Sequence, residues 1–230
     1  MAANDNNRDK PGMRHDSIRI IATTVGVFFG LFSSINHGIF EYLQGNHPTS
    51  GFVINAIGET HRFWLEGTEP AFTLIPNYMY SGIAAILVGI AIIIWSIWFL
   101  PAENGSTVYL GLFILSFLVG GGIGQVFFFV PAWAFATRIG KPLNWWRKVL
   151  PSRCWSFLSR TWVVTLVLAT IGMLIGLEMA IFGYFPGISD LEDLTNINMI
   201  FVFGSAILYI MSFIAGIGHE LLRMEIASST

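Results

Sequence analysis

Charged side chains are scarce in this chain of 230 residues: Asp, Glu, Lys and Arg together make up 11% of it. Soluble domains usually contain about a quarter charged residues. Hydrophobic residues make up 54%, so the chain has too few polar groups to cover the surface of a soluble fold. The same balance excludes disordered, collagen-like and nucleic-acid-binding proteins. The composition therefore predicts a polytopic membrane protein with no nucleic-acid partner.

Cysteine and the common catalytic motifs are also nearly absent. The single Cys154 excludes an intrachain disulfide framework and a multi-cysteine metal site. The sequence contains no nucleotide-binding P-loop, dinucleotide fingerprint, GxSxG elbow or HExxH zinc signature. The sequence motifs therefore identify no cofactor, which stays unknown. Any function has to be inferred from the polar residues of the apolar segments.

Long apolar runs are abundant. A helix needs about 20 residues to cross about 30 Å of hydrocarbon, and four segments meet this requirement: 18–42, 78–100, 162–184 and 197–222. The first is too long for a signal peptide and lacks a small-residue cleavage motif. We therefore expect it to remain as a membrane anchor.

A fifth apolar stretch, 108–139, is too long for one ordinary crossing. It is broken by the run Gly-Gly-Gly-Ile-Gly at 120–124 and again by Pro131. Consecutive glycines disfavour a helix. We expect two short helices, 108–119 and 125–139, that form a glycine-broken hairpin.

The distribution of Lys and Arg sets the expected orientation, because these residues favour cytoplasmic loops. If 108–139 crossed once, the basic segment 140–161 would lie outside the cell. As a hairpin, it returns that segment to the side of the basic N-terminus, and all 12 basic residues except Arg62 become cytoplasmic. The sequence thus predicts an all-α polytopic membrane protein with about six membrane-inserted helices and both termini in the cytoplasm.

The predicted organisation is a cytoplasmic N-terminal arm, 1–17, and one helical-bundle domain, 18–225. Two acidic loops, 45–77 and 185–196, are expected outside. The cytoplasmic loop 140–161 interleaves Trp with Lys and Arg, a composition that favours the membrane interface and anionic lipid head groups. We expect the protein to lie in the plasma membrane with this loop against anionic lipid.

Two stripes of small residues predict close helix packing in lipid. Each stripe has a spacing of four residues, and the two consist of Gly26, Gly30 and Ser34 and of Gly172, Gly176 and Ala180. We expect the first and fifth helices to meet at these stripes. Such stripes also serve association between copies of a chain, so a homo-oligomer stays open.

Polar residues gather at the predicted outer side, where ionisable groups in a span point to function. His37, Glu41 and Gln44 share one helix face, and Glu178 is a lone acid near the end of the fifth helix. The candidate binding residues are His37, Glu41, Gln44, Glu59, His61, Asn77, Gln125 and Glu178. Asn77 is also expected to cap the second helix, and Gln125 follows the glycine break.

Several chemistries fit this cluster. His37, Glu41 and Glu178 are candidate ligands for a divalent metal, and a His37–Glu41 pair in a low dielectric can relay protons. The plain alternative is a His37–Glu41 pair that only fixes packing, or a Glu41 that is simply hydrated. The loop around His61 is expected to be an amphipathic surface helix or a lid over the cluster.

Three classes of function remain open. The first is transport of a small solute, ion or proton through the outer polar cluster, with the glycine break either lining the site, as broken helices do in transporters, or serving as a tight turn. The second is a non-catalytic membrane accessory, sensor or structural protein. The third is a membrane-embedded enzyme that acts on a lipid-soluble substrate.

Overall fold

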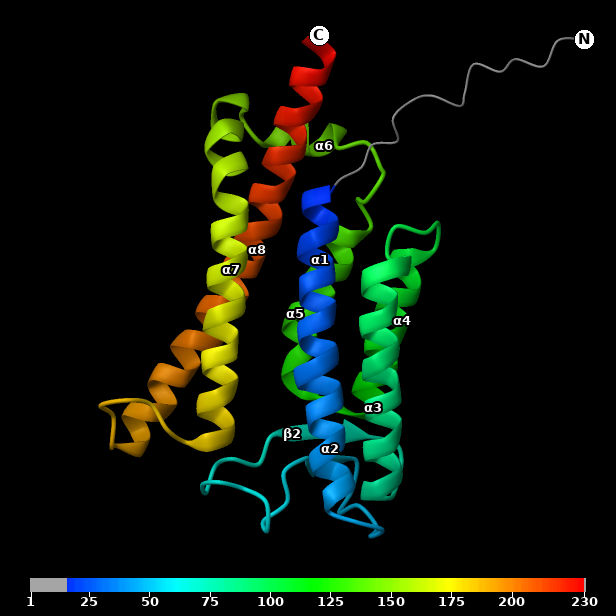
Figure 1. The fold of residues 1–230 in the computed structure, drawn as a ribbon, viewed down its shortest axis with the longest axis vertical. Coiled ribbons are helices and arrows are strands. Elements are labelled where there is room, and N and C mark those ends of the chain that lie inside the picture. The colour runs from blue at the N-terminus through cyan, green and yellow to red at the C-terminus, as the bar shows by residue number, and fades with distance from the viewer. Residues whose placement is uncertain (1–15, 230) are drawn as a thin grey trace, which may run out of the picture.

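The computed structural model describes residues 16–229, which form a bundle of helices with a small sheet near one end (Figure 1). Four helical runs are long and apolar enough to cross a membrane: Asp16–Leu43, Tyr78–Phe99, Ser152–Phe182 and Leu191–Ser229. All four overlap the predicted long spans. The prediction of a membrane protein with four long apolar helices is confirmed.

The first two runs each contain a π-helical segment. The first consists of α1 (Asp16–Phe29), the π-helical η1 (Gly30–Ile35) and α2 (Asn36–Leu43). The second consists of α3 (Tyr78–Ile94) and the π-helical η2 (Trp95–Phe99). Asn77 caps α3, as predicted: its side-chain oxygen accepts a hydrogen bond of 3.2 Å from the backbone N–H of Tyr80.

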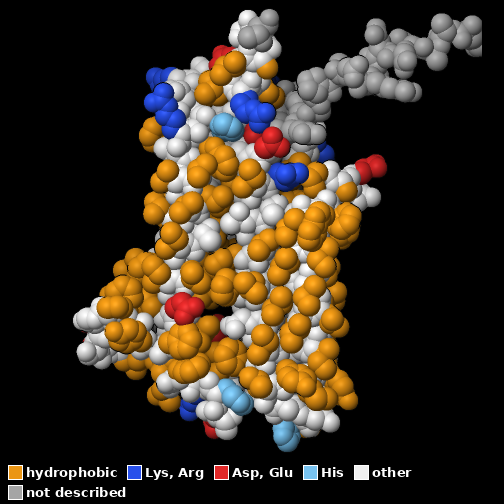
Figure 2. All heavy atoms as spheres, viewed as in Figure 1, with side chains coloured by type: hydrophobic (Ala, Val, Ile, Leu, Met, Phe, Trp, Pro, Cys, Tyr) orange, Lys and Arg blue, Asp and Glu red, His pale blue; other side chains and the backbone are white. Residues whose placement is uncertain are grey.

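The surface has the distribution that a bilayer requires. Figure 2 shows a broad band of hydrophobic side chains between two ends where charged side chains gather. Large apolar residues of the helices are highly exposed, for example Leu87 at 62% and Phe127 at 70%. Lys and Arg gather mainly at the end that carries α6 (Asn144–Val149), which we call the basic end; the end with the strands is the sheet end. Such exposure in water would be an association liability, whereas lipid covers it.

The middle of the chain runs toward the sheet end and back. In Figure 1, α4 (Gly105–Leu118) descends from the basic end and α5 (Val126–Ala136) returns toward it. The two helices have 14 and 11 residues, so they are about 21 Å and 16 Å long. They overlap the predicted short helices, but the segment between them is not a simple turn.

The glycine run forms a strand. Val119–Gly122 is β3, and it is followed by the 3₁₀ turn η3 (Ile123–Gln125). β3 pairs antiparallel with β2 (Pro70–Thr73), which pairs antiparallel with β1 (Val53–Asn55). The expectation of an all-α fold is confirmed, and one short three-stranded sheet is added to the helices. A backbone that leaves the helix inside a bundle must find other partners, and here the predicted outer loop supplies them.

The basic segment is mostly helical. α6 and the first ten residues of α7 (Ser152–Phe182) occupy most of what was predicted as the loop 140–161. Pro151 precedes the first turn of α7, a position where its missing N–H costs nothing. At 31 and 39 residues, α7 and α8 (Leu191–Ser229) measure about 46 Å and 58 Å, so both exceed the hydrocarbon thickness of about 30 Å.

The small-residue stripes pack, but not against each other. A Cβ atom added at Gly26 would meet Ser96 of the second helical run, and one added at Gly30 would meet Ile93. Gly172 and Gly176 instead face α8. The expected contact between the two stripes is thus wrong, because α3 is the neighbour of the first run and α8 is the neighbour of α7.

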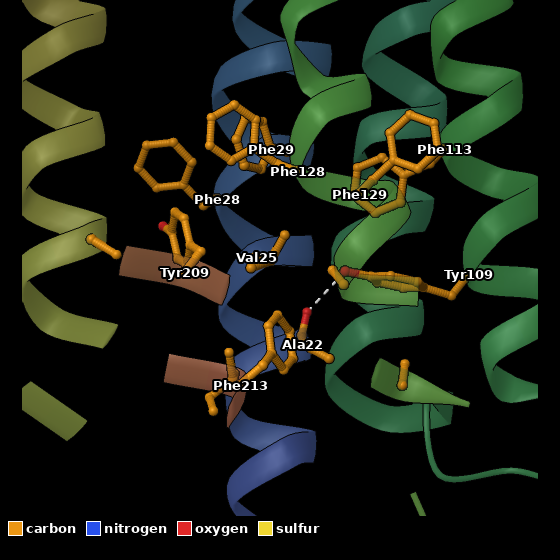
Figure 3. Packing of buried hydrophobic residues seen from close by; sticks show 14 of the residues in the cluster. Ala22, Val25, Phe28, Phe29, Tyr109, Phe113, Phe128, Phe129, Tyr209 and Phe213 are labelled. Atoms are coloured by element: carbon orange, nitrogen blue, oxygen red, sulfur yellow. Dashed lines mark hydrogen bonds between the residues drawn. The ribbon is translucent and has the colours of Figure 1, made fainter. Parts of the chain in front are cut away.

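Aromatic rings fill the core between α1, α4, α5 and α8 (Figure 3). The rings of Phe29 and Phe128 stack with centroids 4.7 Å apart, and those of Phe113 and Phe129 stack at 5.1 Å. Tyr109 is fully buried and donates a hydrogen bond of 2.9 Å to the backbone oxygen of Ala22. This aromatic core occupies the bundle between the sheet end and the basic end.

A distant carboxylate caps the first helix at the basic end. Oε1 of Glu220 in α8 accepts hydrogen bonds from the backbone N–H of Ser17 at 3.0 Å and from its hydroxyl at 2.6 Å. Arg223 lies 3.6 Å from the other oxygen of Glu220 and 3.5 Å from Asp16. Glu220 is 2% exposed; it therefore does not extend to water, and it ties the start of α1 to the end of α8.

Replacing Glu220 tests this contact between α8 and the start of α1. Glu220→Ala leaves the backbone N–H of Ser17 without its acceptor, so we expect a loss of about 1–3 kcal/mol in the free energy of unfolding and a lower midpoint of thermal unfolding in detergent. Glu225→Ala, at an exposed position of the same helix, is the matched control and should behave like the wild type. Equal midpoints for the two variants would contradict the assignment.

Candidate functional site

The first helical run turns two ionisable side chains toward the glycine strand. His37 and Glu41 lie one helical turn apart on α2 and are 5% and 0% exposed. A Cβ atom at Gly122 would lie 2.6 Å from Cε1 of His37, and one at Gly120 would collide with the carboxylate of Glu41. The bare backbone of β3 therefore lies directly against both side chains, within two turns of the end of α2.

A cavity of about 230 Å³ opens beside His37, where η1, α5, α7 and α8 meet the sheet. Its apolar wall contains Phe29, Phe32, Phe128 and several aliphatic side chains of α7 and α8. The polar part of its lining is formed by Ser33, His37, Glu69 and Gln125. We call this space the inner cavity.

The polar groups of the inner cavity are incompletely paired. Nε2 of His37 lies 3.6 Å from a carboxylate oxygen of Glu69, an ion-pair distance when the imidazole is protonated but too long for a direct hydrogen bond. The amide nitrogen of Gln125 donates to Ser116 at 3.3 Å. Within residues 16–229, Nδ1 of His37 and Oε1 of Gln125 are buried with no hydrogen-bond partner. Since buried polar atoms are normally paired, these two are available to a ligand or to water.

A larger hollow of about 710 Å³ lies between the loop that precedes β2 and the sheet-end tips of α7 and α8. It shares Glu69, Pro70 and Ala180 with the inner cavity. Its lining also includes the acidic residues Glu66, Asp190 and Glu192. This acidic vestibule therefore adjoins the inner cavity at Glu69.

The loop that carries Glu69 is anchored to α7. The indole N–H of Trp64 donates a hydrogen bond of 2.8 Å to the backbone oxygen of Ala180, and Phe63 packs against Phe182 with centroids 4.6 Å apart. Residues 58–69 form turns rather than the predicted amphipathic helix. This anchored loop brings Glu69 to His37, 32 residues away in sequence.

Glu41 is isolated from both spaces. It lines neither the inner cavity nor the acidic vestibule, and in the described part of the chain neither of its carboxylate oxygens has a hydrogen-bond partner. His37 is paired with Glu69 instead of with Glu41. The expected His37–Glu41 pair does not form, and Glu41 is not hydrated at the surface.

The other predicted site residues lie elsewhere. The Gln44 amide donates to the backbone oxygens of Asn55 and Ala56 and so holds the loop before β2. Asn77 caps α3, and His61 interacts with neighbouring Thr60. Glu59 and Glu178 are exposed and line neither of the two spaces. The structure thus brings only His37, Glu41 and Gln125 to the glycine strand.

Metal ligation has no support in the part of the chain that the structure describes. Residues 16–229 contain no group of three or more His, Cys, Asp or Glu side chains placed to hold a metal ion. The suggested set of His37, Glu41 and Glu178 therefore does not assemble: Glu178 lies on the exposed face of α7 and His37 is paired with Glu69.

Sequence reasoning did not select several residues that complete the site. Glu69 is one of several acids in the predicted outer loop 45–77, which also contains Thr73. Ser33 and Ser81 are ordinary hydroxyl residues in apolar segments. The one local signal was the residue pair Glu69-Pro70 directly before a short β-type run. Their roles depend on contacts across the sheet, which spacing alone does not encode.

The closeness of Gly120 and Glu41 can be tested directly. Gly120 has φ +108°, so Gly120→Ala should cost about 1–3 kcal/mol in backbone strain and more from the collision with Glu41. We expect a strongly lowered midpoint of thermal unfolding, whereas Gly124→Ala, which has open space around its Cβ position, should be near neutral. Adding Glu41→Ala should recover part of the loss, since only the collision is relieved; strict additivity would contradict the contact.

Comparisons of the chain with protein-family models, with curated proteins and with solved structures find no match. The functional assignment therefore depends on the geometry just described. Its main elements are the acidic vestibule, the inner cavity with its unpaired polar atoms, and the buried Glu41 behind the glycine strand.

Proposed function

We propose that this protein transports a small cation, a small polar solute or a proton across the plasma membrane through the polar cluster at its sheet end. The observation that carries the proposal is the inner cavity, where the His37–Glu69 pair and the free polar atoms of His37 and Gln125 meet at the base of an acidic vestibule. Such an arrangement offers a bound solute both charge and hydrogen bonds.

Charge favours a cationic substrate. Glu66, Glu69, Asp190 and Glu192 line the vestibule, and a cleft lined by one sign of charge concentrates ions of the opposite sign. Arg62 is the one Lys or Arg at this end of the described chain, and its guanidinium donates to the backbone oxygen of Leu65. The path from the vestibule to the cavity therefore attracts cations and repels anions.

Size favours a small substrate. Pockets for drug-sized ligands measure about 300–1,000 Å³, whereas the inner cavity measures about 230 Å³. A lipid-soluble substrate with a long tail would exceed this space, which makes an enzyme acting on lipids the weaker alternative. Stacked Phe29 and Phe128 close the cavity toward the basic end, so the substrate enters from the sheet end in this conformation.

The topology that suits this function has six membrane-inserted helices, with α4 and α5 as the central hairpin and both termini in the cytoplasm. In it the sheet end faces outward and the basic end inward, as the Lys and Arg distribution favours. Pairing of β3 with β2 supplies hydrogen bonds to the non-helical backbone within the bundle, which membrane depth demands. Exposed Arg147 and Lys148 would then contact anionic lipid.

Cysteine labelling tests this topology. In a Cys154→Ser background, single substitutions at three exposed positions, Glu59→Cys, Glu103→Cys and Lys148→Cys, are treated with an impermeant maleimide on intact cells. We expect only the cysteine at position 59 to react before permeabilisation, because the hairpin returns the chain to the inner side. Labelling at 148 together with protection at 103 would indicate a single crossing and refute the hairpin.

Reconstitution tests the transport function. We expect Glu69→Gln to reduce uptake of the transported species at least tenfold in proteoliposomes, since it removes the charge beside His37 and preserves the side-chain shape. The assay screens protons, alkali cations and small amines with a pH-sensitive dye and radiolabelled substrates. Glu103→Gln, an exposed acid in the loop after η2, is the control that should retain wild-type uptake. Wild-type rates in Glu69→Gln, or no uptake above empty liposomes for any species, would refute the proposal.

A further inference from the structure

Glu41 is a buried acid that the inner cavity does not use. It is fully buried, it lines neither the inner cavity nor the vestibule, and both of its carboxylate oxygens are without a hydrogen-bond partner among the described residues. Burying a charged carboxylate without a partner is costly. Ionisable residues kept inside membrane segments at such cost mark functional positions.

No opposite charge faces Glu41 from the elements packed against α2. These elements are α3, η1 and β3, and none of them contains Asp, Glu, Lys, Arg or His. The tyrosines of α3 are directed elsewhere: Tyr80 is exposed, and Tyr78 packs against the apolar cluster of Ile54. On α2 itself, His37 is paired with Glu69. A proton is therefore the partner that can neutralise this carboxylate.

Two buried hydroxyl groups lead from Glu41 toward the sheet end. The hydroxyl of Ser81 and the carboxylate of Glu41 both lie against the same face of Gly120. The Ser81 hydroxyl donates to the hydroxyl oxygen of Thr73 at 2.8 Å and lies 3.1 Å from the backbone oxygen of Val119. Ser81 is 0% and Thr73 is 1% exposed, so this hydroxyl chain runs through the protein interior.

The hydroxyl chain that starts at Glu41 ends at a separate pocket. Thr73 lines a separate pocket of about 240 Å³ whose other walls include Thr49, Gly51 and Pro76. This pocket lies at the C-terminal end of β2, whereas Glu69 and Pro70 place the inner cavity at its N-terminal end. The sheet therefore separates two approaches to α2, one that reaches His37 and one that reaches Thr73.

We propose that Glu41 is a proton-binding site that exchanges with the sheet-end medium through Thr73 and Ser81, independently of the inner cavity. The Ser81 hydroxyl, which donates to Thr73 in the structure, first turns toward Glu41. A hydronium ion in the Thr73 pocket then gives a proton to the Thr73 hydroxyl, which passes its own proton to Ser81, and Ser81 passes its own to Glu41. One proton is transferred, no other bond changes, and rotation of the two hydroxyls restores the starting state. Only the purpose of this site rests on the proposed function: the site supplies the proton that drives solute transport.

Hydrogen–deuterium exchange at the carboxyl group tests this path without any substrate. The C=O band of protonated Glu41 is identified in infrared spectra of the full-length protein as the band that Glu41→Gln removes. After transfer to D₂O, we expect Thr73→Val to slow the isotope shift of this band at least tenfold, because valine keeps the shape of threonine and lacks the hydroxyl. Thr73→Ser, the matched control, should retain a rate close to the wild type, and Ser81→Ala should repeat the slowing independently.

The results that would overturn this proton path differ from the results that would overturn the transport proposal. Exchange at the wild-type rate in Thr73→Val and Ser81→Ala would overturn the path. Slowing by His37→Gln or Ser33→Ala would overturn it too, because these residues line the inner cavity and not the Thr73 pocket. Absence at every pH of a band that Glu41→Gln removes would show that Glu41 binds no proton. Loss of uptake in Glu69→Gln, by contrast, leaves the exchange rate of Glu41 unchanged.

Discussion

The constraint on which the structure depends is the need to hydrogen-bond a non-helical backbone within a helical bundle. The glycines of 119–122 cannot continue α4 as a stable helix, and inside lipid their N–H and C=O groups would have no water. Pairing with β2 solves this problem, with Ala71 opposite Gly122 and Thr73 opposite Val119. The long loop after α2 is therefore part of the bundle, because it supplies the strand that the glycines require.

The pairing of β2 with β3 also positions the polar residues of both approaches to α2. The N-terminal end of β2 follows Glu69, which meets His37, and its C-terminal end carries Thr73, which meets Ser81. Because Gly120 and Gly122 have no side chains, α2 can bring Glu41 and His37 directly against the strand. Any larger residue at these positions would separate the strand from α2, so the residues that break the helix also create the space for the ionisable groups.

Hydropathy and local chemistry predicted the four long helices, the break at the glycines and the Asn77 cap, because each of these depends on residues close in sequence. The sheet was missed because β1 and β2 have three and four residues, and the pairing of β2 with β3 joins residues about 50 positions apart in sequence. The expected His37–Glu41 pair failed for a similar reason: helical spacing places the two side chains on one face, but an acid from a distant loop pairs with the histidine. The stripes of small residues correctly marked close packing and did not specify the neighbouring helix.

The inner cavity lies between two parts of the bundle: the elements packed around the sheet, here called the sheet-bound part, and the α7–α8 pair. Different contacts hold these two parts together at the basic end and at the sheet end. At the basic end, the buried carboxylate of Glu220 accepts two hydrogen bonds from Ser17, and bonds to a charged acceptor are about twice as strong as neutral ones. At the sheet end, the fastening is one neutral bond from Trp64 to Ala180 and the contact between Phe63 and Phe182. Separation of the two parts therefore costs less at the sheet end. A motion that widens the vestibule would pivot about the Ser17–Glu220 contact, and it would leave the Ser81–Thr73 path intact, since that path lies wholly within the sheet-bound part.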